Sequence, residues 1–226
     1  LAMSIPSSIE VTDPNAPCVE ISFIDDVSGD VIKSMTVKPG YTISEYDYPA
    51  IPEHDGYMFA GWDYLSDKRV YFNTEIHGYY CDAVNPIWSF ETQYQAEQWI
   101  SVDGDNDGRS WFWSEFRPSE GYLYAYDGER CMASESYSNT LEMPLTPDNW
   151  LISPEIVLHE SIENPKLSFY IRAQASGYEE EHLGIYVSTD NGATWLDELD
   201  YLETTAEYTR YEIDLSDFAG QTIVIG

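Results

Sequence analysis

Positively charged residues are scarce in this sequence. Its 226 residues include 10 Lys and Arg but 41 Asp and Glu, which gives a formal net charge of −31 at pH 7. A surface with this charge repels phosphate groups and attracts divalent cations. We therefore expect no nucleic-acid partner and no binding to anionic lipid, whereas divalent cations are favoured ligands.

Long apolar runs are also missing. No stretch reaches the roughly 20 apolar residues that a membrane-spanning helix needs, so we expect no membrane insertion. No secretory signal peptide is visible either, but such a segment is removed from mature secreted proteins. Its absence therefore does not argue for a cytoplasmic protein.

Cysteine is rare, and its positions follow no metal-binding spacing. The three cysteines, Cys18, Cys81 and Cys131, are an odd number and form no C-x-x-C pair. This argues against a zinc ribbon and a dense disulfide framework. We expect three partly buried thiols. A Cys18–Cys81 disulfide is the alternative, because these two residues flank the same segment.

Aromatic and turn-forming residues are abundant instead. The chain has 19 Tyr, 7 Trp, 14 Gly and 12 Pro, with no long helical repeat between them. This pattern predicts many short strands and hence a mainly β fold. A chain of this length can form one large β domain or two smaller ones. Residues 1–16 are small, polar and punctuated by proline, which predicts a linker.

Residues 17–84 contain closely spaced strand signals. The alternating segments "CVEISFID" and "VIKSMTV" flank the turn "VSGD", and a proline-rich stretch leads to "GYMFAGW". This succession resembles the Listeria–Bacteroides repeat (the internalin B-repeat family). The resemblance implies a small β-grasp-like module that acts as a spacer or interaction unit on bacterial surface proteins, without catalysis. The positions that carry it are Gly40, Pro49, Pro52, Gly56, Tyr57, Phe59, Gly61 and Trp62. For its aromatic residues, the strand period predicts core packing.

Residues 85–226 contain seven further strand signals, which predict a β-sandwich or jelly roll. The segments "FETQYQAEQWISVDGDNDGRSW", "LTPDNWLISPEIVL", "YEEEHLGIYVSTDNG" and "AGQTIVI" resemble, in order and spacing, the cleaved adhesin domain family of gingipain-type proteases and haemagglutinins. The resemblance implies a MAM-like β-jelly-roll sandwich that binds calcium and takes part in adhesion to host proteins and cells. Family members continue past "GQTIVIG", so we expect this domain to be truncated at its C-terminal end.

The loop "DGDNDG" places Asp103, Asp105 and Asp107 at alternate positions before a glycine. Calcium takes six to eight oxygen ligands, and carboxylates at this spacing match the first half of an EF-hand loop. The twelfth position is Ser114 rather than glutamate, which argues against an EF-hand. We predict a structural calcium site in a sandwich loop, with Glu91 of the first strand as a further ligand. The alternatives are a plain solvated turn and an exposed strand glutamate.

Two other motifs carry weaker signals. Glu181 and His182 of "YEEEH" form either a sheet-edge hydrogen-bond pair, which we favour, or an acid–base pair. The segment "STDNGATW" matches the Asp-box pattern of sialidases, in which Asp190 and Trp195 support a turn, and it predicts scaffold. Common nucleophile and phosphate-loop motifs are missing. We therefore expect no enzymatic activity.

Together these patterns predict a non-enzymatic adhesin module. It would be extracellular or attached to the bacterial cell surface, bind a host protein or glycan, and share its parent chain with further domains. The alternatives are a structural stalk, or an accessory or carbohydrate-binding module, of a larger secreted protease or glycosidase. A flat row of exposed rings would favour carbohydrate, and a mixed polar patch would favour protein. The candidate contact residues, for which core packing is the favoured alternative, are Trp111, Trp113, Tyr122, Tyr124 and Tyr178.

Overall fold

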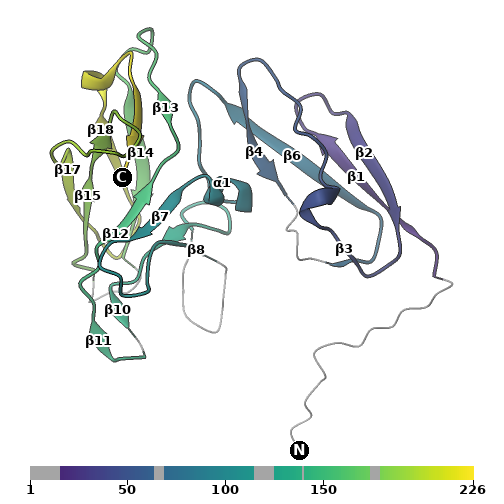
Figure 1. Ribbon diagram of the computed structural model, residues 1–226, viewed down its shortest axis with the longest axis horizontal. Helices are drawn as coiled ribbons and strands as arrows, with labels where there is room; N and C mark the ends of the chain where they lie inside the picture. The colour runs from purple at the N-terminus through teal and green to yellow at the C-terminus, as the bar shows by residue number, and fades with distance from the viewer. Residues whose placement is uncertain (1–15, 64–68, 115–124, 139, 174–178) are drawn as a thin grey trace, which may run out of the picture. The chain divides into compact units, whose positions relative to one another are not determined.

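The computed structural model describes residues 16–63, 69–114, 125–138, 140–173 and 179–226. The chain divides between Trp88 and Ser89 into two compact units, whereas the sequence predicts a boundary between residues 84 and 85. Both units are built mainly from β-strands, as predicted (Figure 1). The predicted linker lies outside the described residues except for Ala16.

The first unit is a small mixed sheet with the strand order β2-β1-β6-β4. β1 and β2 form an antiparallel hairpin, and β6 runs parallel to β1 after a crossing segment. This strand order agrees with the β-grasp-like module that the resemblance to the B-repeat family implies. Its elements are β1 (Val19–Asp25), β2 (Val31–Val37), β3 (Tyr41–Thr42), η1 (Glu45–Asp47), β4 (Tyr57–Trp62), β5 (Arg69–Val70) and β6 (Thr74–Asp82).

The core of this unit follows from strand alternation. Ile21 and Phe23 on β1 are fully buried, and Phe59 is 7% exposed. The Trp62 ring packs edge-on against Phe23, with ring centroids 5.5 Å apart. The core prediction is wrong for Tyr57, which is 52% exposed. Tyr57 pairs with Asp82, the last residue of β6, and so lies at the end of the strand pair.

The cysteines carry no disulfide in the described structure. In the parallel β1–β6 pair, Ile21 lies opposite Thr74 and Asp25 opposite Gly78. Cys18 precedes the start of this pairing and Cys81 follows its end, so the two thiols lie at opposite ends of the sheet. The alternative of a Cys18–Cys81 bridge is therefore wrong. Cys81 and Cys131 are half-buried, as expected, but Cys18 is exposed.

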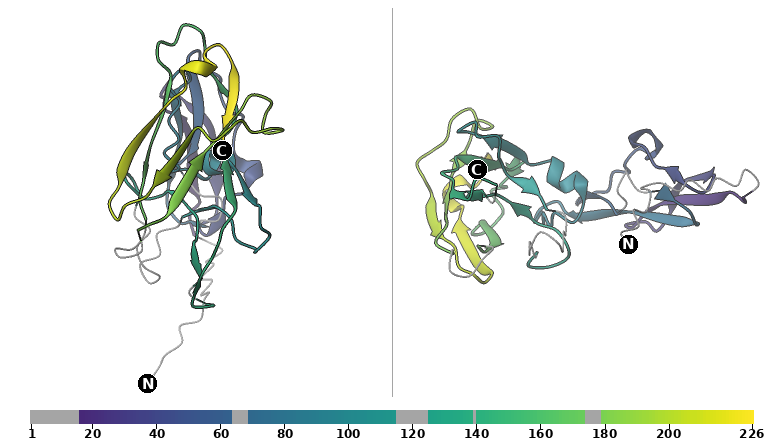
Figure 2. Two further views of the ribbon diagram at one scale, coloured as in Figure 1. Left: turned by 90° about the vertical axis from the view of Figure 1, so that its left-hand side faces the viewer. Right: turned by 90° about the horizontal axis from the view of Figure 1, so that it is seen from below.

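The second unit is a β-sandwich of short antiparallel pairings; Figure 2 gives two further views. Strand β19 pairs with β13 on one side and with β16 on the other. The elements are α1 (Gln93–Glu97), β7 (Ile100–Asp103), β8 (Phe112–Trp113), β9 (Met132–Ala133), β10 (Tyr137–Ser138), β11 (Met143–Pro144), β12 (Asn149–Ile152), β13 (Ile156–Val157), β14 (Lys166–Ile171), β15 (His182–Ile185), β16 (Val187–Ser188), β17 (Asp200–Glu203), β18 (Thr209–Asp214), η2 (Ser216–Phe218) and β19 (Thr222–Ile225).

The sandwich core collects the inward positions of several strand pairs. Its buried residues come from β15, β16, β17, β18 and β19, from the turn containing η2, and from Leu158, which follows β13. Burying such side chains contributes about 1.5–3 kcal/mol each relative to exposure. The core residues are Leu158, Ile185, Val187, Leu202, Ile213, Leu215, Phe218, Ile223 and Ile225.

Candidate functional site

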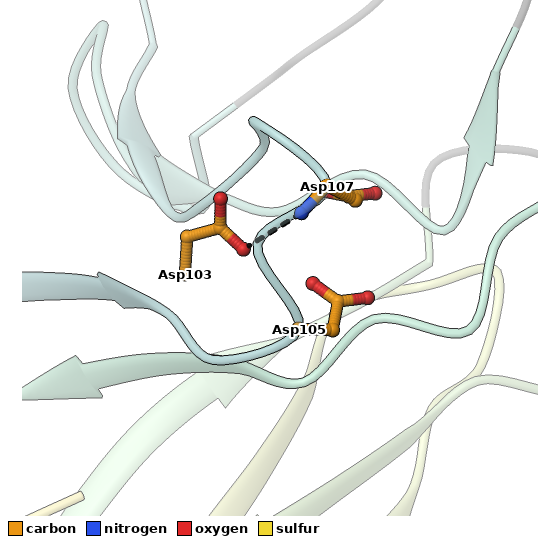
Figure 3. Close-up of side chains that lie close together, drawn as sticks. All are labelled: Asp103, Asp105 and Asp107. Atoms are coloured by element: carbon orange, nitrogen blue, oxygen red, sulfur yellow. Dashed lines mark hydrogen bonds between the residues drawn. The ribbon is translucent and has the colours of Figure 1, made fainter.

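The acidic loop connects β7 to β8. β7 ends at Asp103, which lies opposite Asn149 of β12 in the antiparallel register. The Asp103 carboxylate then accepts a backbone hydrogen bond from Asp107, at 3.2 Å (Figure 3), and another from Gly108, at 2.9 Å. Asn106 and Gly108 both have positive φ angles, of 58° and 84°. Short polar residues and glycine tolerate that conformation, so the sequence itself closes this turn.

The turn brings the three predicted ligands together. One carboxylate oxygen from each of Asp103, Asp105 and Asp107 lies within 4.8 Å of the others. No described lysine or arginine forms an ion pair with them. The neighbouring Arg109 instead pairs with Glu135 and donates a hydrogen bond to Ser138 at 3.1 Å. Three unneutralised carboxylates therefore face one another at the surface.

The electrostatics of the loop reflect this crowding. Desolvation raises the pKa of Asp105, and the hydrogen bond with Asp103 and the charge of Asp107 raise it further. For Asp103, desolvation acts in the same direction, but the hydrogen bonds from the Gly108 amide, from Asp105 and from the Asp107 amide outweigh it and lower the pKa. Hard oxygen donors of this kind suit a calcium ion. A bound cation would also relieve the repulsion that disfavours ionised Asp105.

Glu91, the fourth predicted ligand, lies elsewhere. Its carboxylate accepts backbone hydrogen bonds from Glu129, at 3.0 and 3.1 Å, and from Arg130, at 3.0 Å. Among the described residues, the group of adjacent carboxylates comprises the three aspartates and does not include Glu91. A Cβ on Gly128 would lie 2.4 Å from Oε1 of Glu91, so the turn fits closely around this carboxylate. In this structure Glu91 fixes the 128–130 turn.

Sequence reasoning missed Asp148 as a neighbour of the acidic loop. The backbone carbonyl of Asp148 accepts a 2.8 Å hydrogen bond from the Gly104 amide. Its carboxylate accepts a 2.9 Å hydrogen bond from the Trp150 indole. The segment "TPDNW" carries the resemblance to the adhesin family, but its residue pattern does not predict that Asp148 contacts Gly104. That contact follows from the β7–β12 register.

The Asp-box turn has the hydrogen bonds of a scaffold. Asp190 accepts hydrogen bonds from the Thr194 hydroxyl at 2.7 Å, the Thr194 amide at 2.8 Å and the Ser188 hydroxyl at 2.7 Å. These bonds lower the pKa of Asp190 to about 2. The Trp195 ring packs against Trp150, with centroids 5.2 Å apart. All of these groups are engaged within the turn and its support.

The remaining predicted residues have separate roles. Glu181 accepts a hydrogen bond from Ser136, while His182 is exposed and stacks on Tyr201. No hydrogen bond joins Glu181 to His182 in the described part of the chain, so neither an acid–base pair nor the favoured sheet-edge pair is formed there. The indoles of Trp111 and Trp113 donate to the carbonyls of Asn149 and Phe90 and are half-buried. Tyr122, Tyr124 and Tyr178 lie outside the described residues.

None of the helices in the described ranges has the length and apolar composition needed to cross a membrane.

Comparison with known proteins gives a consistent family assignment. The profile of the Cleaved Adhesin Domain matches residues 84–217. The chain is 28% identical over 180 residues to Hemagglutinin A of Porphyromonas gingivalis, covering 71% of this chain and 6% of that protein. It is 35% identical over 179 residues to Gingipain R1 of the same species, covering 78% of this chain and 10% of that protein. The chain thus spans about a tenth or less of these relatives.

A solved structure is also similar. It is the K1 cleaved adhesin domain of Lys-gingipain from Porphyromonas gingivalis W83, at 27% sequence identity and a TM-score of 0.46. The match covers 57% of this chain and 78% of that one.

Proposed function

The chain belongs to the Cleaved Adhesin Domain family, and we propose that its second unit is a non-enzymatic adhesion module that binds a host protein or glycan. The family match, which spans residues 84–217, is the observation that carries this proposal. The similar haemagglutinin and gingipain are much longer than this chain, which supports a place among further domains of a parent protein. We place that parent outside the cell or on the bacterial surface.

We propose that the acidic loop holds a structural calcium ion. The three adjacent carboxylates supply hard oxygen donors, and the amide hydrogen bonds to Asp103 already hold the turn closed. When bound, the ion would neutralise Asp105 and Asp107 and pin the β7–β8 connection. The surrounding loops would then present a rigid surface to a ligand, which lowers the ordering cost of binding. The assignment of Glu91 as a further ligand remains a prediction.

We propose that the first unit is an internalin B-repeat module that acts as a spacer. Its mixed sheet with a parallel β1–β6 pair supports this assignment, as does the packing of Phe59 and Trp62 into its core. The motif positions Gly56 and Gly61 have φ angles of 81° and 120°, which favour glycine. The residues of the GY-x-F-x-GW motif are therefore explained by their roles in the fold, and no ligand is needed to account for them.

Binding of the purified chain to immobilised host glycans and matrix glycoproteins in millimolar calcium tests the adhesion function. We expect a specific set of hits, and repeating them in chelator shows whether calcium supports the binding surface. An Asp105→Asn variant should reproduce the chelator result, whereas Glu180→Gln, at an exposed glutamate, should match the wild type. A blank array would contradict the adhesion function and favour the structural stalk.

A further inference from the structure

The outer face of the β15–β17 pair carries several aromatic rings and carboxylates. Along these strands, Leu183, Ile185 and Leu202 pack into or against the sandwich core. Strand alternation turns the neighbouring positions outward. We call this outer surface the β15–β17 face. It comprises His182 and Gly184 of β15, Tyr201 and Glu203 of β17, and Tyr186 and Glu198, which lie just outside the two strands and approach Gly184.

Gly184 lies at the centre of the face and lets side chains approach the backbone. It is paired with Tyr201 of β17. A Cβ at this position would lie 2.5 Å from Oε1 of Glu198 and 2.8 Å from the Tyr186 ring. The Tyr186 hydroxyl donates a 2.9 Å hydrogen bond to Oε1 of Glu198. Tyr186 and Glu198 therefore cross directly above Gly184, and the Glu198 carboxylate is held in a fixed position.

The charge on this face is negative and uncompensated. Glu198 and Glu203 form no ion pair in the described part of the chain, and neither does Asp148, beyond Tyr186. The hydrogen bond from Tyr186 to Glu198 raises the pKa of Tyr186, with desolvation and the charges of Glu198, Asp148 and Tyr201 adding to the effect. The negative charges of Glu198 and Asp148 therefore both act on the Tyr186 hydroxyl. Within a chain of net charge −31, the face attracts cations and repels anionic ligands.

The rings of this face do not form one plane, and Tyr186 and Trp150 are half-buried. Tyr201 is 55% exposed and stacks on His182, with centroids 4.9 Å apart and planes at 29°. Beyond Gly184, the Tyr186 ring lies 5.1 Å from Trp150 at an angle of 43°. A glycan chain that stacks on several rings needs a flat row. Here the rings are tilted and a carboxylate stands between them, which favours a protein ligand over a carbohydrate.

We propose that the β15–β17 face binds a lysine- or arginine-bearing segment of a partner protein, with the cationic side chain over the Tyr201 or Tyr186 ring and its charge against Glu198. Aromatic faces attract cations, and a nearby carboxylate adds a charge-assisted hydrogen bond. Electrostatic complementarity of this kind also raises the association rate and fixes specificity. The inference rests on the proposed adhesion function and names the ligand chemistry of that module.

A short fluorescently labelled peptide of alternating lysine and serine is the probe, and fluorescence anisotropy with the whole purified chain at about 0.15 M salt is the measurement. Tyr201→Ala should weaken binding about fivefold, and Glu198→Gln by a similar factor. Tyr201→Phe keeps the ring and should bind like the wild type. The matched controls lie in the first unit: Tyr57→Ala, at a tyrosine that is 52% exposed, and Glu53→Gln, at an exposed glutamate, should leave binding unchanged.

Three results would overturn the inference. Equal losses in the face variants and the controls would mean that only the overall charge attracts the peptide. Absence of peptide binding would reject the ligand chemistry. Binding of a neutral oligosaccharide that Tyr201→Ala abolishes, without peptide binding, would make the face a carbohydrate site. The adhesion function is tested separately. Hits on the glycoprotein array that persist in Tyr201→Ala, without peptide binding, would support the adhesion function and reject the peptide site on the β15–β17 face. A blank array with intact peptide binding would reject the adhesion function and support the peptide site.

Discussion

The imidazole Nδ1 of His77, on β6, lies 2.6 Å from Oδ1 of Asp26, the residue that follows β1. This contact ties together the two parallel strands of the first unit at one end. The hydrogen bond to Asp26 raises the pKa of His77 above its ordinary value, against the effect of desolvation. The charges of Asp26, Asp63 and Glu75 act in the same direction as the hydrogen bond.

The raised pKa of His77 predicts that the first unit is more stable in mild acid than in mild alkali. A group whose pKa is raised on folding contributes stability that is fully present below its unfolded pKa, about 6.5, and that is lost as the pH rises through the folded value. Hydrogen exchange of β1 and β6 in the whole chain should therefore show greater protection at about pH 6 than at about pH 8, after correction for intrinsic rates.

The control for this prediction uses a second histidine. His77→Gln should reduce the pH dependence of protection in β1 and β6, whereas His159→Gln, at an exposed position in the second unit, should not. If the pH dependence of protection is unchanged in His77→Gln, a titrating group other than His77 must cause it.

Calcium should raise the melting temperature of the chain. An ion that binds only the folded state stabilises it by RT ln(1 + [L]/Kd), which is about 2.7 kcal/mol at a hundredfold excess over Kd. Asp105→Ala should shrink this shift, and because it removes like-charge repulsion it should not destabilise the calcium-free protein. Glu180→Ala should keep the full shift. Identical melting curves in calcium and in chelator would refute the calcium site.

The acidic loop shows what local sequence can predict. The three aspartates meet because the turn between Asp103 and Gly108 is closed by hydrogen bonds spanning four and five residues. Spacing along the chain is then enough to place them together. Strand alternation is also a local pattern, and it correctly places Ile21 and Phe23 in a strand. The two-residue period of a strand puts both side chains on one face, and both are buried.

Glu91 and Asp148 show what local sequence cannot predict. Glu91 accepts amide hydrogen bonds from a turn 38 residues further along the chain. Asp148 reaches Gly104 only through the register of β7 with β12. Both contacts depend on which strand ends the fold brings together, and several pairings fit the same hydrophobic pattern. The β15–β17 face is non-local for the same reason, since Gly184 and Tyr201 meet by cross-strand pairing.

The hydrogen bonds of Glu91 predict a stability effect that is independent of calcium. Glu91→Ala leaves the amides of Glu129 and Arg130 without their acceptor, and hydrogen bonds to a charged group contribute about 1.5–3 kcal/mol each at most. Because Glu91 is only half-buried, we expect a loss of about 2 kcal/mol in total. Chemical denaturation with and without calcium should show equal losses. A loss of the calcium-induced stabilisation in Glu91→Ala would instead support the prediction that Glu91 is a calcium ligand.

Gly78 of β6 predicts a steric limit in the core of the first unit. A Cβ at this position would lie 2.9 Å from Cζ3 of Trp62 and 3.2 Å from the Phe59 ring. Gly78 does not adopt a positive φ angle, so alanine is acceptable to the backbone and any cost comes from the rings. Overpacking of this kind costs about 1–3 kcal/mol, and Gly78→Ala should lower the free energy of unfolding by that amount.

Adding Trp62→Leu makes room for the methyl group, so the double variant should be more stable than the sum of the two single changes predicts. Strict additivity in a urea denaturation series would show that the Trp62 ring does not limit residue 78.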